Sequence, residues 1–289
     1  FHKHTRAFLK IQDGCNYGCS YCIIPKLRGA SHSRQLAQIV KEAKQLADNG
    51  YKEIVLCGIC LGAYGRDLGD KEGLVRVIEE LEKIEGLARL RLSSIEASDV
   101  RPALIQKMGD SSKLCRHLHI PFQSGDDAVL KLMRRKTMTE GYRRLIRSLR
   151  RESPDIGITT DIMIGFPGEK EDNFRNTIDF LKEAKPSRMH IFPFSGRKDT
   201  PAYDFKDTVK SQTIKERAGI MKSLAKELAQ DFYRQNLDKE LEVLVEANAG
   251  YSSNYIKVYI AGVDIPPNSL IKIKTQKLYK DGLICSTLK

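Results

Sequence analysis

Three cysteines lie close together near the start of the sequence, at positions Cys15, Cys19 and Cys22. They follow a short apolar run at residues 7–11. Thiolates at such short spacings hold iron–sulfur clusters, and a four-iron cluster normally takes four of them. Because no fourth cysteine lies nearby in the sequence, one iron would lack a protein ligand. An open metal position is where catalysis takes place, as in catalytic zinc sites.

Two other interpretations of these cysteines are a zinc site and three unrelated core thiols. Zinc knuckles usually come as paired Cys-x-x-Cys units, and no matching second pair lies beside this stretch. Buried free cysteines are common singly, but three in one glycine-containing loop are not. The spacing therefore favours an iron–sulfur cluster with one open iron.

The composition indicates a globular protein of about two domains. The chain has 289 residues, of which 41% are hydrophobic, enough for a core. No apolar run approaches the roughly 18 residues of a membrane span, and nothing at the start resembles a signal peptide. Seven cysteines, three of them clustered, fit reduced thiols in a cytoplasmic protein better than a disulfide framework. The net charge of +12 favours a polyanionic partner.

Short apolar runs alternate with helical periodicity over residues 1–210. Strands separated by helices, all in the same direction, predict an α/β barrel. Six βα units fall short of the eight in a closed TIM barrel, so we expect a partial, open barrel. Its chemistry should lie at the C-terminal ends of the strands, where the cysteine loop leaves the first one. The strands are expected at residues 7–11, 53–57, 89–92, 118–121, 158–164 and 189–192.

The periodicity changes after the barrel. Residues 211–236 are expected to form one connecting helix whose apolar stripe packs against the barrel. Residues 237–289 alternate apolar and polar positions between turns, which predicts a small antiparallel β-barrel. Tyr255, Lys257 and Lys272 belong to a basic and aromatic surface on this second domain, and such a mixture suits RNA.

A basic run spans residues 134–151. It includes Arg135 and, in the helix expected at residues 140–151, Arg143, Arg147 and Arg150. A charge run on one helix is often only a solvated face. Because the whole chain is basic, contact with nucleic-acid phosphates is the stronger interpretation.

Histidine gives little information. His117, His119 and His190 lie in or beside predicted strands, so we interpret them as satisfied core or barrel-mouth histidines. No Ser/His/Asp arrangement, Walker loop or Rossmann GxGxxG sequence occurs, which removes the hydrolase, nucleotidase and NAD-enzyme interpretations.

The cysteine motif, with an aromatic residue before the last cysteine, resembles the signature of radical S-adenosylmethionine (SAM) enzymes. Longer strings resemble one family among them, the methylthiotransferases, and the resemblance covers nearly the whole chain. The terminal β-barrel matches the place and size of that family's RNA-binding TRAM domain. The strings are LKIQDGC at 9–15, CIIP at 22–25, LSSIE at 92–96, HIPFQSG at 119–125, DIMIGFPGE at 161–169 and FSGRKDTPA at 194–202.

The resemblance implies a 4Fe-4S cluster on Cys15, Cys19 and Cys22, with SAM bound at its open iron. Tyr21 resembles the family residue that lies beside the adenine. Glu96 and Asp161 could accept hydrogen bonds from the ribose hydroxyls or the SAM amine. The expected pocket at the strand ends is formed by Gly58, Ser94, Glu96, Gln123, Asp161 and Gly165.

These enzymes replace a C–H bond by C–SCH3 on a tRNA adenosine or a ribosomal protein. The cluster reduces SAM to a 5′-deoxyadenosyl radical that abstracts hydrogen, and a second SAM supplies the methyl group. An electron donor such as flavodoxin or ferredoxin is implied, and we expect a monomer. The family's N-terminal domain, with a second 4Fe-4S cluster linked to sulfur delivery, is absent from this sequence, which therefore resembles a fragment.

Another departure from the family is the pair Cys57 and Cys60, where relatives usually have other residues. Two cysteines are too few for a metal site unless Cys115 joins them, so we interpret the pair as lining or packing. Cys115 and Cys285 are interpreted as structural.

Two strings, GICLGAYG at 58–65 and SNYIKV at 253–258, resemble the branch that acts on threonylcarbamoyladenosine at tRNA position 37, in the anticodon loop. The isopentenyladenosine branch is the nearest alternative, and the ribosomal-protein branch is more remote. From another class, the chain could be a catalytically incomplete RNA-binding module.

Overall fold

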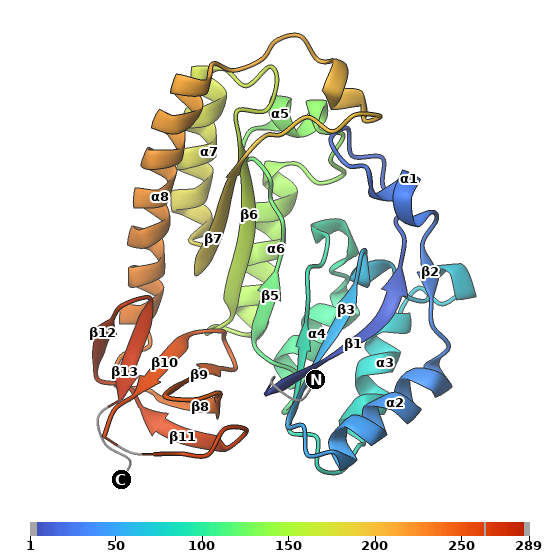
Figure 1. The fold of residues 1–289 in the computed structure, drawn as a ribbon, viewed down its shortest axis with the longest axis vertical. Helices are drawn as coiled ribbons and strands as arrows, with labels where there is room; N and C mark the ends of the chain where they lie inside the picture. Colours follow the sequence, from blue (N-terminus) through green and yellow to red (C-terminus); the bar gives the residue numbers. More distant parts are fainter. Residues whose placement is uncertain (1–4, 263, 286–289) are drawn as a thin grey trace.

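The computed structural model describes residues 5–262 and 264–285, and within them six parallel strands form an open, partial barrel (Figure 1). The strands are β1 (Arg6–Asp13), β3 (Glu53–Gly58), β4 (Arg89–Leu92), β5 (His117–His119), β6 (Gly157–Ile164) and β7 (Arg188–Pro193). They lie in two sheets, and parallel bridges between Leu90 and Leu114 and between Ser94 and His119 join β4 to β5. The predicted partial α/β barrel is therefore confirmed.

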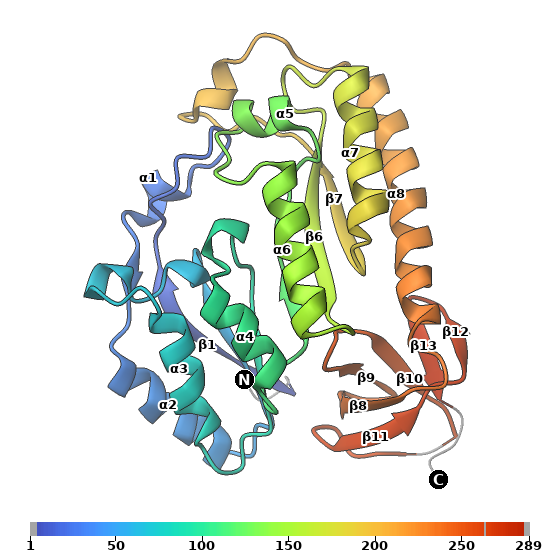
Figure 2. The ribbon, with the colours of Figure 1, turned by 180° about the vertical axis from the view of Figure 1, so that it is seen from behind.

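Helices cover the convex side of the barrel and leave its concave side, the lumen, open (Figures 1 and 2). A short strand, β2 (His32–Ser33), pairs antiparallel with β1. The helices are α1 (Ile24–Arg28), α2 (Leu36–Asp48), α3 (Gly73–Glu82), α4 (Pro102–Asp110), α5 (Asp127–Leu132), α6 (Thr139–Glu152), α7 (Glu171–Ala184) and α8 (Ser211–Arg234).

Alternation along β1 shows how the strands divide core from lumen. Ala7, Leu9 and Ile11 are fully buried in the core, whereas Phe8 between them is 45% exposed. Successive side chains of a strand point to opposite faces. Ala7, Leu9 and Ile11 therefore pack under the helices, and the residues between them face the lumen. Similar alternation on the other strands places polar side chains inside the barrel.

The C-terminal residues form a separate six-stranded sheet with its own core, in the order β11-β8-β9-β10-β13-β12 within residues 240–262 and 264–285. The prediction that it is antiparallel throughout is wrong at one pair, since β10 and β13 run parallel. Pairing between strands so far apart in the chain does not follow from local alternation. The strands are β8 (Glu240–Val245), β9 (Ala249–Ser252), β10 (Lys257–Ile260), β11 (Leu270–Lys274), β12 (Lys277–Tyr279) and β13 (Gly282–Cys285).

A buried charge cluster joins this sheet to the barrel. Glu53, with a fully buried side chain, pairs with Arg91 (Nε to Oε1, 2.7 Å) and with Arg89 (Nε to Oε2, 3.2 Å). Arg91 also donates to the carbonyl oxygens of Ser252 and Ser253, both at 3.1 Å. Arg89 Nη2 donates to Tyr251 O (3.2 Å), so the two arginines tie the barrel to the end of β9 and the loop that follows it.

The division of the chain into a barrel, a connecting helix and a terminal domain stays a prediction; the last barrel strand ends at Pro193, α8 spans Ser211–Arg234 and β8 begins at Glu240. The outermost residues of the predicted domains, 1–4 and 286–289, lie outside the described residues, as does residue 263. Among the described residues, no helix combines the length and the apolar character needed to cross a membrane.

Candidate functional site

The three clustered cysteines lie on one loop at the C-terminal end of β1, as the sequence predicts. Cys15, Cys19 and Cys22 are half-buried free thiols. Gly14 opens the loop with φ of 68°, and a Cβ there would meet Ala30 O at 2.0 Å. Only glycine fits this position, because it alone tolerates both the positive φ and the close backbone approach.

Hydrogen bonds fix the cysteine loop against two distant segments. Ser20 N donates to Met133 O (3.0 Å), and Ser20 Oγ donates to Leu132 O (2.7 Å), at the end of α5. Ala202 N donates to Ser20 O (2.8 Å). The loop is thus held on both sides before any ligand binds.

Gln12 connects the cysteine loop to the end of β3. Its Nε2 donates to Gly14 O (2.8 Å) and Ser31 Oγ (2.9 Å), and its Oε1 accepts from Cys60 N (2.7 Å). A Cβ at Gly58 would lie 2.8 Å from Gln12 Oε1. Gly58, expected in the cofactor pocket, therefore makes room for a buried glutamine that positions the loop.

Arg135 links Glu96 to the cysteine loop. Its guanidinium donates two hydrogen bonds to the Glu96 carboxylate, from Nη1 to Oε1 (2.8 Å) and from Nη2 to Oε2 (2.6 Å). Nη2 also donates to Pro121 O (2.7 Å). Nη1 lies 3.8 Å from Cys19 Sγ. Sequence reasoning assigned Glu96 to the site but left Arg135 in the basic run, since nothing local shows that it turns inward.

Asp99 organises a second group beside the loop. It accepts hydrogen bonds from Arg66 Nη2 (2.6 Å), from the Tyr17 hydroxyl and from Cys60 Sγ (3.5 Å). A hydrogen bond with Cys60 lowers the pKa of Cys15 to about 7, although burial opposes the shift. A thiol with a lowered pKa is a better metal ligand, because the thiolate is the form that binds. A cavity of about 180 Å³ opens beside Tyr17, Cys60 and Arg66.

The structure separates the other cysteines. Cys60 lies beside Cys15, whereas Cys57 donates from its Sγ to Val55 O (3.4 Å). Cys115 lies next to Glu53, at the opposite end of β3. Cys57, Cys60 and Cys115 therefore have different surroundings, and lining or packing for Cys57 and Cys60 and a structural role for Cys115 stay interpretations.

The remaining predicted pocket residues differ in their surroundings. Gly165 has φ of 73°, and a Cβ there would meet Ile214 Cγ1 at 2.6 Å, so it serves packing against α8. Ser94 bridges to β5. Gln123 also has a positive φ, 67°, and its buried Oε1 has no hydrogen-bond partner among the described residues. Tyr21 packs edge-on against Phe166, with ring centroids 6.4 Å apart.

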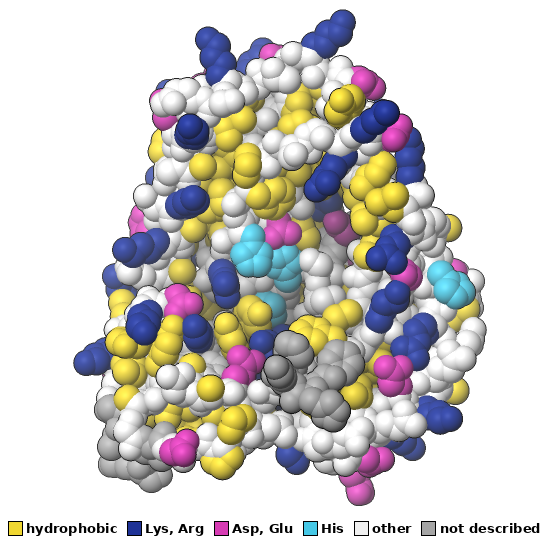
Figure 3. All heavy atoms as spheres, in the orientation of Figure 1, with side chains coloured by type: hydrophobic (Ala, Val, Ile, Leu, Met, Phe, Trp, Pro, Cys, Tyr) yellow, Lys and Arg dark blue, Asp and Glu magenta, His cyan; other side chains and the backbone are white. Residues whose placement is uncertain are grey.

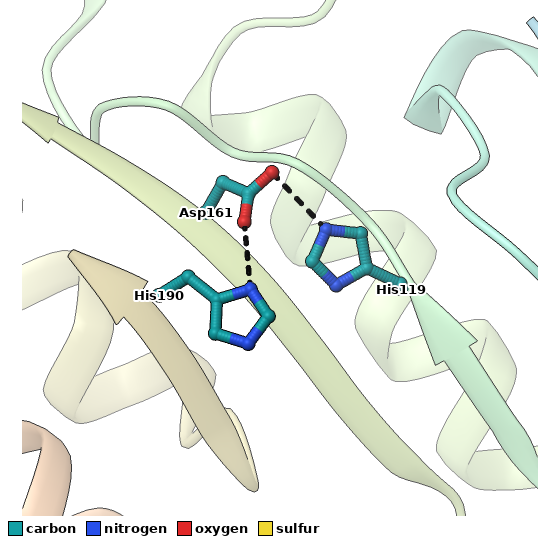
Figure 4. Close-up of side chains that lie close together, drawn as sticks. All are labelled: His119, Asp161 and His190. Atoms are coloured by element: carbon teal, nitrogen blue, oxygen red, sulfur yellow. Dashed lines mark hydrogen bonds and ion pairs between the residues drawn. The ribbon is translucent and has the colours of Figure 1, made fainter. Parts of the chain in front are cut away.

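Asp161 lies in the lumen between two histidines, from β5 and β7 (Figure 4). Asp161 Oδ2 is 3.2 Å from His119 Nε2, and Asp161 Oδ1 is 3.2 Å from His190 Nδ1. His119 Nδ1 lies 2.9 Å from Thr159 Oγ1. Burial alone would raise the pKa of Asp161, but its interactions with His119 and His190 lower it. These histidines have partners, as expected, yet they form a polar centre in the lumen that sequence reasoning missed.

The open side of the barrel is hollowed at its centre, where histidine side chains gather (Figure 3). Lysine and arginine side chains surround the hollow on the same face. A polyanion approaching from this side would therefore meet positive charge before reaching the lumen.

The family model of the radical SAM superfamily matches residues 9–181. This chain belongs to the radical SAM methylthiotransferases. It is 40% identical to the threonylcarbamoyladenosine tRNA methylthiotransferase MtaB of Bacillus subtilis, over 98% of this chain and 65% of that protein. It is 37% identical to the tRNA-2-methylthio-N(6)-dimethylallyladenosine synthase of Acetivibrio thermocellus, over 88% of this chain and 52% of that protein.

A solved structure supports the fold. The radical SAM methyltransferase TsrM from Kitasatospora setae, described with cobalamin and a [4Fe-4S] cluster bound, superposes with a TM-score of 0.58. The match is 19% identical and covers 68% of this chain and 38% of that one. At this identity the likeness concerns the fold alone. The chain spans just under two thirds of the length of the Bacillus subtilis relative.

The residues present fit the cofactors of a radical SAM enzyme. Three free thiols on one loop are the soft donors that an iron–sulfur cluster takes, and three thiols leave one iron open. The orphaned buried Oε1 of Gln123 is an acceptor that a bound donor group would satisfy. Membership of the superfamily therefore implies a 4Fe-4S cluster and SAM at this end of the barrel.

The basic residues expected to bind RNA do not share one face of this radical SAM protein. Figure 2 shows α6 on the convex side, away from the lumen. There Arg143 pairs with Glu183 (2.7 Å), and Arg150 donates to Ala184 O (2.7 Å). Arg147 pairs with Glu140 on the same helix at 3.0 Å.

The predicted RNA-binding residues of the terminal sheet also have different surroundings. Lys257 lies 3.6 Å from Asp281, and Lys272 lies 3.8 Å from Glu240, both on the surface of the sheet. Tyr255 instead stacks on His117 of β5, with ring centroids 4.4 Å apart. It therefore faces the barrel rather than open solvent.

Proposed function

We propose that this protein carries out SAM-dependent radical methylthiolation of a modified adenosine in tRNA. The observation that carries the proposal is the loop of three half-buried free thiols at the C-terminal end of β1, beside Arg135 and Cys60. Relatives from two branches, both named for tRNA adenosine products or substrates, support the choice of tRNA.

Cys15, Cys19 and Cys22 would hold the cluster, and Gln12 and Ser20 would keep their loop in place. When bound there, the cluster and SAM would supply radical chemistry for abstracting hydrogen from the substrate. Arg135 and Glu96 would line the SAM site, with Tyr21 beside the adenine. Gly58, Gly165 and Gln123, whose Oε1 lacks a partner among the described residues, would shape its walls.

The target adenosine would enter the lumen from its open side. The anticodon loop is single-stranded, so its bases can be splayed out without breaking a helix. The terminal sheet would act as a TRAM-like RNA-binding domain through Lys257 and Lys272, while Arg143, Arg147 and Arg150 would meet phosphates farther along the tRNA. A flavodoxin or ferredoxin would supply electrons to a monomeric enzyme.

Threonylcarbamoyladenosine at position 37 is the substrate that we propose. The support is the 40% identity to an enzyme of that name over nearly the whole chain. The isopentenyl branch is the alternative, because relatives of that type are 37% identical over a shorter part of the chain.

Mass spectrometry of tRNA nucleosides tests this proposal. A strain that lacks the gene is expected to lose 2-methylthio-threonylcarbamoyladenosine and to accumulate its unmethylthiolated precursor. Loss of only the isopentenyl product would move the assignment to the neighbouring branch. An intact tRNA profile would contradict the proposed function altogether.

Residues 1–289 alone are expected to cleave SAM when reduced but not to methylthiolate tRNA. We propose that a second 4Fe-4S cluster, held outside these residues, delivers the sulfur. This chain alone would then lack the sulfur donor. SAM cleavage is followed by release of 5′-deoxyadenosine and product formation by nucleoside analysis. Full methylthiolation by this chain alone, without added protein, would show that the sulfur route is wrong.

A further inference from the structure

A second cavity, of about 240 Å³, lies at the N-terminal ends of the barrel strands, away from the cysteine loop. We call it the floor cavity. Its wall combines aromatic and apolar residues with an unusual number of basic ones. The basic residues that line it are Arg6, Arg91, Arg188, His117, His119 and His190.

Most of the charges around the floor cavity are already paired. Arg91 is held by Glu53, and Arg6 lies 2.9 Å from Glu246. Arg188, at the start of β7, is exposed and has no carboxylate partner among the residues that the structure describes. Since Glu53 also has Arg89 beside it, the arginines outnumber the carboxylates here, and the floor cavity carries a positive excess.

The terminal sheet closes this cavity from below. Tyr255 has φ of 67°, an uncommon conformation for a bulky residue. Its ring stacks with His117 and with Tyr251, at 4.4 and 4.9 Å, and the Arg91 guanidinium lies 4.9 Å from its centroid. Contacts on several sides hold the floor in one conformation, so the cavity is preformed.

The place of the cavity along the strands relates it to the reaction. The cofactors bind at the C-terminal ends, whereas Arg188 opens β7 and His190 follows two residues later. If the target adenine enters from the open side and faces the cofactors, the substituent on its N6 atom would point deeper into the lumen. His119, Asp161 and His190 lie in the lumen, with Asp161 between the two histidines (Figure 4).

The two kinds of relative differ in the chemistry of that substituent. Dimethylallyl is a hydrocarbon, whereas threonylcarbamoyl contains an amino acid and so carries a carboxylate at neutral pH. A hydrocarbon gains nothing from an unpaired guanidinium and would strip water from it at a cost. A carboxylate forms a charge-assisted pair with the same group.

We propose that the floor cavity binds the carboxylate of the substrate's N6 substituent, with Arg188 as its ion-pair partner. His190, two residues from Arg188 in the same wall, donates from Nδ1 to Asp161 Oδ1 (3.2 Å), which holds its ring in orientation. The proposal rests on the proposed function, because it concerns the same lumen and names the substrate group that the enzyme recognises.

A metal ion is the other ligand that His119, Asp161 and His190 could take, since their ligand atoms lie within 4.8 Å of one another. Each imidazole, however, is directed at a different oxygen of Asp161, as in a hydrogen-bonded chain. We therefore assign these three residues to positioning, and metal analysis of the purified protein is part of the test.

The test uses the enzyme at its native length and anticodon stem-loops that carry threonylcarbamoyladenosine or its neutral methyl ester. We expect R188Q to lower kcat/KM on the carboxylate RNA by about 10- to 100-fold, mainly through KM. R188Q should match the wild type on the ester RNA, and R188K should recover most of the activity. RNA affinity measured by fluorescence anisotropy without SAM should show the same pattern.

R175Q is the matched control, because within residues 5–262 and 264–285 Arg175 forms its ion pairs with Glu171 and Asp172, on the exposed side of α7. It should change neither RNA. Equal losses by R188Q on both RNAs, or no loss on either, would overturn the carboxylate pocket. Metal additional to the cluster iron, bound in proportion to protein and lost in H190Q, would replace the carboxylate pocket with a metal site. Failure of the wild type itself on the carboxylate RNA would instead mark failure of the proposed function.

Discussion

Alanine at any one of Cys15, Cys19 or Cys22 is expected to abolish the four-iron cluster. After anaerobic reconstitution with iron and sulfide, the broad absorbance at about 400 nm from thiolate-to-iron charge transfer should disappear, and iron per chain should fall to the background level. The loss should be complete in each variant, because a cluster already missing one protein ligand cannot tolerate the removal of another. SAM cleavage should be lost with it.

Cys57 and Cys60 provide the controls for this prediction. C57A should retain the cluster, since its Sγ bonds to Val55 O and lies apart from the loop. C60A removes the hydrogen bond to Cys15 but no predicted ligand, so it should load iron, less tightly than the wild type. Unchanged iron content in all three variants of the loop would contradict the assignment of these cysteines as cluster ligands. Loss of iron in C60A alone would identify Cys60 as a ligand.

The barrel could be predicted from the sequence because its signals are local. Each strand is a short apolar run between helices with their own periodicity, and every strand expected between residues 7 and 192 is present. The cysteine loop is equally local, since all three thiols lie within eight residues. Strand order then places the loop at the C-terminal edge with no further information.

The charge partners within the site could not be predicted, because they come from distant parts of the chain. Arg135 belongs to a basic run in the sequence, yet in the fold it is 7% exposed and holds Glu96, which is 39 residues away. Asp161 and the two histidines come from three adjacent strands, and only the register of β5, β6 and β7 brings them together.

Tyr255 shows the same limit in the terminal sheet. Its aromatic type and basic neighbours indicate an RNA-stacking residue, but the ring stacks on His117. The reason is the docking of the loop after β9 onto the barrel, which depends on Arg91 reaching the carbonyl oxygens of Ser252 and Ser253. A tertiary contact of this kind leaves no mark in local sequence.

Glu53→Gln is expected to destabilise the protein by about 3–5 kcal/mol, because it leaves Arg89 and Arg91 buried without a countercharge. Both arginines are only 2% exposed, so water cannot replace the carboxylate. E183Q is a matched control. Its partner Arg143 lies at the same distance of 2.7 Å, but Glu183 is 54% exposed, and such surface pairs contribute about 0–1 kcal/mol. Chemical denaturation of the two variants gives the comparison.

The difference in unfolding free energy between wild type and E53Q is expected to depend on pH. Burial opposes ionisation of Glu53, but Arg91 and Arg89 outweigh it and lower the pKa of the carboxyl below its ordinary 4.5. A lowered pKa in the fold means that the ionised group stabilises the native state above pH 4.5, and that this stability is lost as the pH falls through the folded-state pKa. The difference in unfolding free energy between wild type and E53Q should therefore be constant near neutral pH and shrink on acidification.

The contact between the barrel and the terminal sheet should weaken in E53Q, together with the loss of overall stability. In E53Q the two arginines are no longer fixed on the barrel side, so their hold on the loop after β9 weakens and the Tyr255 ring loses its support from Arg91. Proteolytic cleavage should appear near residues 251–256 at pH 7 in E53Q but not in E183Q. A stability difference that grows as the pH falls, or a junction equally resistant in both variants, would mean that Glu53 is not the ionised centre joining the barrel to the terminal sheet.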